Sequence, residues 1–97
     1  MIPLRLPPPR LEVEVQPELP HLTYTPLPRP SYVDQLTYLG FLHGQRRWRS
    51  AAGNYYTYDG RHCELEVFNR RGVHIGVADI QSGVFIKPAV RGRRIDV

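Results

Sequence analysis

The sequence is poor in cysteine and has no long apolar segment. Only one of its 97 residues is cysteine, which excludes an internal disulfide and any metal cluster built from several cysteines. No apolar run is long enough to cross a bilayer, so we expect no membrane partner. The first residues lack the continuous apolar region of a signal peptide. If the protein leaves its cell, we therefore expect another carrier.

Motifs for metal binding are also missing. The chain has four histidines, and no two of them stand at the spacing of metal ligands. A His-Glu-x-x-His motif and paired Cys-x-x-Cys motifs are both absent. The sequence therefore predicts no bound metal and no cofactor. The histidines are His21, His43, His62 and His74.

Proline is concentrated at one end of the chain. Nine of the ten prolines lie in residues 1–30, so we divide the chain into a proline-rich arm, residues 1–30, and a folded domain, residues 31–97. The arm is typical of a stiff, extended linker. Two alternatives stay open: the arm docks on the domain, or it binds an SH3-like partner. Docking is favoured by the apolar residues Leu11, Val13, Leu19, Leu22 and Tyr24.

The positive charge belongs to the domain. Three arginines and three glutamates cancel in residues 1–30, so residues 31–97 carry the whole net charge of +4. Twelve of the thirteen basic residues are arginine, which suits bidentate phosphate contacts and stacking on bases. A basic domain that is also rich in tyrosine indicates a nucleic-acid partner. The alternative is an ordinary solvated basic surface.

The pattern along residues 31–97 predicts an α+β fold. Tyr32, Leu36 and Leu39 recur at helical spacing after Ser31, which predicts a short helix from about Tyr32 to Leu42. Period-two segments then predict strands, and their short connections allow only antiparallel neighbours. We expect this helix to pack on a small, strongly twisted antiparallel meander. The predicted strands are 54–58, 61–68, 73–78 and 84–87, followed by an irregular basic tail.

The segment from Tyr55 to Phe68 is central to the function. Asp59-Gly60 between two strand-like runs is a strong hairpin signal. Side chains alternate along the second strand, so one set of residues should face the core and the other an open surface. The core set is Cys63, Leu65 and Val67, and the open set is His62, Glu64, Glu66 and Phe68.

A histidine and two carboxylates on one surface can perform proton transfer on RNA, which carries its own nucleophile. A base, Glu66 or Glu64, would take the proton of the ribose 2′-OH, and His62 would protonate the leaving 5′-oxygen. Arg93 or a neighbouring arginine would stabilise the phosphate charge. Along a flat strand His62 and Glu66 would lie about 13 Å apart at roughly 3.3 Å per residue. The competing interpretation is a turn aspartate, Asp59, beside solvated charges.

These residues resemble those of a known family. The sequence Tyr56-x-x-Asp59-x-x-His62-x-Glu64-Leu65-Glu66 is followed by Gly72-x-His74-Ile75-Gly76 and a basic tail. Together with Trp48, Asp79 and Gly83, this pattern is similar to the cytotoxic domain of cloacin and the ribosome-inactivating E-type colicins. The similarity covers about residues 46–97.

The resemblance implies a metal-independent endoribonuclease that cuts 16S ribosomal RNA in the decoding site and stops translation. It implies two partners, the ribosome and an acidic immunity protein, and a site of action in the bacterial cytosol. The alternative is a non-catalytic RNA- or ribosome-binding module of the same fold.

Site roles carry over from this family by position. The catalytic residues fall on Asp59, His62, Glu66 and Arg93, and the family's site tyrosine and substrate-binding lysine fall on Tyr56 and Lys87. We also place Glu64 and Phe68 in the substrate-binding set. Phe68 stands where the family has a tyrosine and so lacks a hydroxyl. The tail reads Arg-Gly-Arg-Arg, so Arg91 and Arg94 are alternatives to Arg93 and are also expected to bind substrate.

Overall fold

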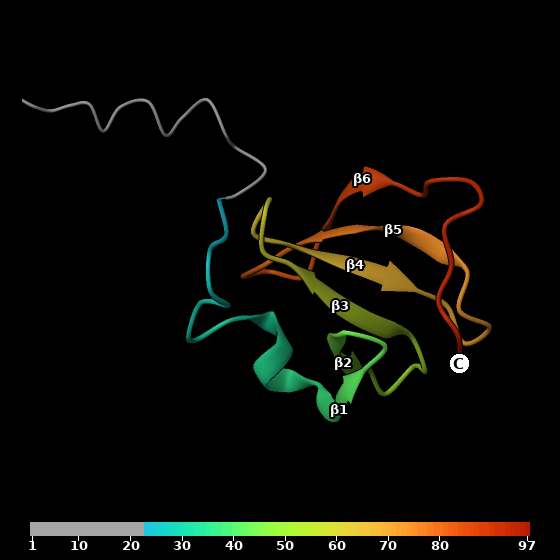
Figure 1. Ribbon diagram of the computed structural model, residues 1–97, viewed down its shortest axis with the longest axis horizontal. Helices are drawn as coiled ribbons and strands as arrows, with labels where there is room; N and C mark the ends of the chain where they lie inside the picture. The colour runs from blue at the N-terminus through green and yellow to red at the C-terminus, as the bar shows by residue number, and fades with distance from the viewer. Residues whose placement is uncertain (1–22) are drawn as a thin grey trace, which may run out of the picture.

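The computed structural model describes residues 23–97, which form one six-stranded antiparallel sheet (Figure 1). Each strand pairs with the next along the chain, in the order β1-β2-β3-β4-β5-β6. Within residues 23–97, no helix is long and apolar enough to span a membrane. The elements are a 3-10 helix η4 (Tyr32–Gln35), β1 (Thr37–Leu42), β2 (Gln45–Arg49), β3 (Tyr55–Asp59), β4 (Glu64–Phe68), β5 (His74–Asp79) and β6 (Phe85–Pro88).

The α+β prediction is wrong, because the segment expected to be a helix is mostly a strand. After the single turn of η4, Leu36 is already extended at φ −107° and ψ 164°. Thr37–Leu42 then pairs with β2, with an irregularity in register between Tyr38 and Gly40. Gly40 has φ +103°, a conformation that glycine adopts without strain and a helix does not contain. The described residues therefore form an all-β sheet with almost no helix.

The other elements follow the sequence pattern more closely. The meander and its antiparallel pairing are confirmed, and four of the strands lie within three residues of their predicted limits. The strands β1 and β2 were not predicted. The central hairpin also differs: Asp59 pairs with Glu64, so residues 60–63 form a four-residue loop instead of a two-residue turn. His62 therefore lies in a loop and not on a strand face.

The two faces of the sheet have different chemistry. Trp48, Tyr56 and Val67 lie in one cross-strand row, and all three are buried in the apolar core. Leu65 and Val67 are fully buried, and Cys63 packs against this core, as predicted. The opposite face carries a cross-strand row of Arg47, Thr57, Glu66, Val77 and Lys87. Glu66 is therefore presented on the face away from the core.

The N-terminal part of the described chain covers the core face in place of the predicted helix. Leu27, Tyr32 and Leu36 pack on the core, and the Tyr32 N–H donates to the Ile80 carbonyl at 2.8 Å. The Tyr58 hydroxyl donates to the Thr25 carbonyl. Residues 24–30 of the arm therefore dock on the domain, as the docking alternative predicts. The division at residue 30 stays a prediction, and Leu11, Val13, Leu19 and Leu22 lie outside the described residues.

The C-terminal segment, residues 89–97, is irregular, as predicted, and runs back past the ends of β5, β4 and β3 (Figure 1). The His74 N–H donates to the Arg93 carbonyl at 3.0 Å, and the Ile95 N–H donates to the Gly72 carbonyl at 2.9 Å. Further along, the guanidinium of buried Arg47 donates to the Asp96 carbonyl at 2.7 Å. These bonds fix the segment, and they place Arg93 beside β4.

Candidate active site

The loop after β3 orients the imidazole of His62. Asp59 Oδ1 accepts hydrogen bonds from the backbone N–H groups of Arg61 at 3.0 Å and His62 at 3.3 Å. Its Oδ2 lies 2.7 Å from His62 Nδ1. Cys63 closes the loop with φ +56°. The His62 side chain is 60% exposed, so its ring is held at Nδ1 while the rest of the ring stays accessible.

The same hydrogen bonds favour the ionised form of Asp59. Partial burial raises the pKa of this carboxyl, but the bonds from the His62 ring and from the backbone N–H groups of Arg61 and His62 outweigh burial. The pKa of Asp59 therefore lies below its ordinary value of 3.8. A negative Asp59 is the partner that stabilises a protonated imidazole.

Glu66 lies between a cation and a buried histidine. Its Oε1 is 2.9 Å from Arg93 Nη1 and 2.7 Å from His74 Nε2. His74 Nδ1 accepts the backbone N–H of Val90 at 2.9 Å, so in the neutral ring the proton is on Nε2, facing Glu66. This contact is close but poorly aligned, and within residues 23–97 Nε2 has no hydrogen bond of good geometry. Phe68 packs edge-to-face on the ring of His74.

Two adjoining cavities meet at these groups. The larger has a volume of about 650 Å³ and the smaller about 420 Å³. The residues that line both cavities are Asp59, His62, Glu66 and Arg93. His62 and Glu66 thus share a site despite the separation expected along a flat strand, because His62 is in the loop.

A second ion pair lies in the smaller cavity. Lys87 Nζ on β6 is 3.0 Å from Glu64 Oε1 on β4. The lysine side chain is 51% exposed and the carboxylate 16%. Both groups line the same cavity as Glu66 and Arg93. With Asp59, this cavity is lined by two cations and three carboxylates.

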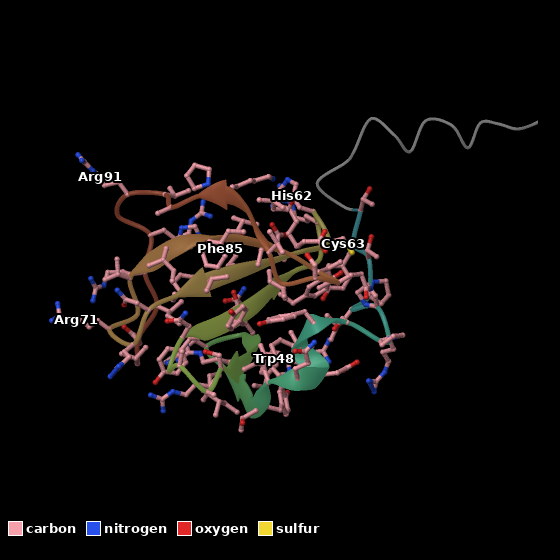
Figure 2. All side chains as sticks on the ribbon, turned by 180° about the vertical axis from the view of Figure 1, so that it is seen from behind. Trp48, His62, Cys63, Arg71, Phe85 and Arg91 are labelled. Atoms are coloured by element: carbon pink, nitrogen blue, oxygen red, sulfur yellow. The ribbon has the colours of Figure 1, made fainter. Side chains whose placement is uncertain are left out.

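The remaining predicted residues divide into two groups. Phe68 and Arg94 line the larger cavity. Tyr56 is buried on the core face and lines neither cavity, because it alternates with Thr57, the neighbour that faces the site. Arg91 points away from His62 at the opposite end of the sheet (Figure 2) and also lines neither cavity.

Sequence reasoning gave no site role to three residues that the structure places here. His74 contacts Glu66 only because of a bulge between Val67 and Phe68 that sets the register with β5. Tyr24 and Arg46 line the larger cavity. Tyr24 reaches it because the N-terminal segment docks on the sheet, and Arg46 reaches it because it lies on β2. Neither the docking nor this strand follows from a local sequence pattern. The one available signal was the alternation through residues 73–78, which assigns His74 to a sheet face.

One set of side chains has the composition of a metal site. Asp59, His62 and Glu64 offer ligand atoms that lie within 4.8 Å of one another. These side chains already pair with other groups, since Asp59 bonds His62 and Glu64 bonds Lys87. A cation there would have to displace both contacts, and Lys87 would oppose it. The donor set therefore fits an ion poorly.

The structure thus combines a small basic sheet domain with histidine, carboxylate and arginine groups around a shared cleft. A family model described as Cytotoxic matches residues 40–96, more than half of the chain. The chain therefore belongs to the family of cytotoxic ribonuclease domains of cloacin and the ribosome-inactivating E-type colicins. The predicted resemblance is confirmed. No curated protein sequence matches the chain.

Proposed function

We propose that this colicin-type toxin domain is a metal-independent endoribonuclease that cleaves 16S ribosomal RNA in the decoding site and so stops translation. The observation that carries the proposal is that Asp59, His62, Glu66 and Arg93 line both cavities. Family membership supports a toxin of the nuclease type. The choice of RNA rests on the chemistry that these side chains can perform without a metal.

In the proposed reaction Glu66 is the general base. It takes the proton of a ribose 2′-OH, and the 2′-oxygen then forms a bond to the adjacent phosphorus. Arg93, 2.9 Å from Glu66, stabilises the charge on the phosphoryl oxygens.

His62 is the general acid in this scheme. Its Nδ1 is held by Asp59, so Nε2 is the atom that can donate to the leaving 5′-oxygen. Breaking the bond between phosphorus and the 5′-oxygen gives a 2′,3′-cyclic phosphate on one fragment and a 5′-hydroxyl on the other. Asp59 is ionised at neutral pH and stabilises the imidazolium before the proton is transferred.

The phosphates next to the cleaved bond need further cations. Lys87 and Arg94 line the two cavities on either side of the catalytic groups. Lys87 is paired with Glu64 in the free protein, so a bound phosphate would compete with that carboxylate. We assign Glu64 the role of positioning Lys87.

The test is a gel of RNA from ribosomes incubated with the full chain. We expect one new fragment from the 3′ end of 16S rRNA, with a 5′-hydroxyl end and a 2′,3′-cyclic phosphate on its complement. The alternative, a non-catalytic RNA-binding module, predicts ribosome binding without any fragment. A 3′-hydroxyl on the complement would exclude attack by the 2′-oxygen.

The same proposal includes an acidic immunity protein that binds the toxin in the producing cell, and a site of action in the bacterial cytosol. The net charge of +4 supports a partner of opposite charge. The proposed immunity protein is tested by co-expression. An acidic protein that co-purifies with the chain and abolishes its toxicity would support it.

A further inference from the structure

The strands β2 and β3 separate next to the loop of residues 60–63. Their pairing runs from Arg49↔Tyr55 to Arg47↔Thr57 and stops there. The next residues of β2 pair only with β1, while β3 continues alone on this side to Asp59. The larger cavity opens between the two strands. It is lined by Gly44, Gln45 and Arg46 from one and by Thr57, Tyr58 and Asp59 from the other.

An exposed aromatic ring is fixed at this cavity. Tyr24 lines it and is 62% exposed, yet its ring meets Tyr58 edge-to-face with centroids 6.2 Å apart. Its face also lies against Gly60, where an added Cβ would come within 2.0 Å of the ring. The neighbouring Thr25 N–H donates to the Gly60 carbonyl at 2.8 Å. The ring is therefore held in place with much of its surface available for stacking.

The β2 wall offers polar groups of the kind that read a base. Arg46 is exposed, and its guanidinium lies over the Trp48 ring at 5.5 Å, which restricts its orientation. Gln45 is also exposed, and its amide supplies both donors and an acceptor. Aromatic faces combined with arginine and amide groups are how proteins bind unstacked RNA bases.

We propose that the cavity between β2 and β3 is a nucleobase subsite, which takes one unstacked base of the substrate RNA next to the bond that is cut. Tyr24 is the stacking surface, and Gln45 and Arg46 contact the edge of the base or its phosphate. The volume of about 650 Å³ is within the range of small-ligand sites. This assignment rests on the proposed function, since it supplies the positioning of a flexible RNA strand.

The experiment uses binding without cleavage. The ¹⁵N-labelled full chain is titrated with the four nucleoside 5′-monophosphates, which have no bond to cut, and with ribose 5-phosphate. We expect the nucleotides to shift the amide signals of residues 44–46 and 58–62. Tyr24→Ala should weaken nucleotide binding by at least about fivefold, because stacking on one aromatic ring contributes about 1–3 kcal/mol. Binding of ribose 5-phosphate should be unchanged.

Two further variants keep the test specific. Gly60→Ala leaves Tyr24 in the chain but displaces its ring. It should therefore weaken nucleotide binding as Tyr24→Ala does. Phe85→Ala removes an aromatic ring that is 46% exposed and lines neither cavity, and it should have no effect. Equal affinity for ribose 5-phosphate and the nucleotides, or shifts that avoid both segments, would overturn the subsite.

This readout is separate from the proposed function. Nucleotide binding at residues 44–46 without cleavage of ribosomes would retain the subsite and remove the ribonuclease assignment. Cleavage of ribosomes without nucleotide binding at residues 44–46 would retain the ribonuclease assignment and remove the subsite.

Discussion

Asp59 joins two functions in one side chain, since it closes the loop before β4 and holds the ring of His62. Its carboxyl oxygens accept three hydrogen bonds, and those bonds lower its pKa. The loop that forms the site is therefore stabilised by the same charge that the proposed acid needs. This coupling has a consequence for stability as a function of pH.

The protein should lose stability on acidification below about pH 4. The pKa of Asp59 is lower in the folded chain than its ordinary value of 3.8, so its contribution is complete above that value and is lost as pH falls through the folded pKa. The pKa of Asp79 is lowered in the same direction by the N–H groups of Ser82 and Gln81. Urea unfolding between pH 2 and pH 6 measures the effect. Asp59→Asn should reduce the dependence of the unfolding free energy on pH in this range. An unchanged dependence would contradict the assigned hydrogen bonds.

Cleavage should not depend on a metal bound to the protein. The side chains of Asp59, His62 and Glu64 already pair with one another or with Lys87, and the proposed reaction needs only proton transfer. Protein treated with a chelator and then assayed on ribosomes at constant Mg²⁺ should cleave at the untreated rate. Stimulation by added Zn²⁺ or Mn²⁺ that disappears in Glu64→Gln would instead establish a metal centre.

At the scale of single residues, the sequence identified Asp59, His62 and Glu66 because they belong to a motif with fixed spacing, whereas it left Arg93 as one of three candidate arginines in the tail. It did not identify His74 or Tyr24. Contact between His74 and Glu66 depends on a shift in the pairing register between β4 and β5. The position of Tyr24 depends on a segment that docks against Tyr58, more than 30 residues away in sequence. Such non-local contacts leave no local pattern.

Among the elements, the C-terminal segment has the clearest role, because it brings Arg93 to Glu66. It is fixed at its end by Arg47, which is 5% exposed and donates to the Asp96 carbonyl. The guanidinium of Arg47 also lies 5.6 Å from the centre of the Tyr55 ring. Arg47 is thus a positioning residue, and it touches none of the reacting atoms in the proposed scheme.

Arg47→Met should lower both stability and turnover. Loss of a buried, charge-assisted hydrogen bond costs about 1–3 kcal/mol, and displacement of Arg93 should reduce kcat roughly 10- to 100-fold. Thermal unfolding and single-turnover cleavage measure the two effects.

A matched control and a double variant separate positioning from general damage. Arg49→Met removes an exposed arginine that also lies over Tyr55 but makes no hydrogen bond to the C-terminal segment, and it should cleave normally. If Arg47 acts through Arg93, then Arg47→Met combined with Arg93→Ala should be no slower than Arg93→Ala alone. Additive losses would show that Arg47 acts elsewhere.

The elements also show where sequence patterns are ambiguous. Tyr32, Leu36 and Leu39 fit a helical stripe, but in the structure Leu39 is 38% exposed and lies on β1. A window of eleven residues is compatible with either structure, and pairing with β2, which depends on residues 45–49, decides between them. The strands β3, β4 and β5 were predictable because alternation and turn residues agree there.

Across the whole molecule, charge is the dominant property. The chain is basic, with a sequence pI of about 9.6, and Arg46, Arg61, Arg93 and Arg94 line the two cavities. A polyanion is attracted to such a surface over distances longer than any single contact. The proposed acidic inhibitor would use the same attraction.

Binding of that inhibitor should weaken as salt is added. Oppositely charged surfaces associate faster at low ionic strength, and screening reduces this attraction at distances beyond about 8 Å at physiological salt. Stopped-flow association rates at increasing NaCl concentration measure the effect. Rates and affinities that do not change with salt would indicate an apolar interface instead.

The most direct test of the account is primer extension on 16S rRNA from ribosomes treated with the full chain, with His62→Ala and with Glu66→Ala. We predict one strong stop in the decoding site for the unaltered protein and a loss of about 100- to 10,000-fold in each variant, as removal of a general acid or base produces. Both variants should remain folded, because the two side chains lie outside the apolar core. Full cleavage by both folded variants, or no stop with the unaltered protein, would contradict the account.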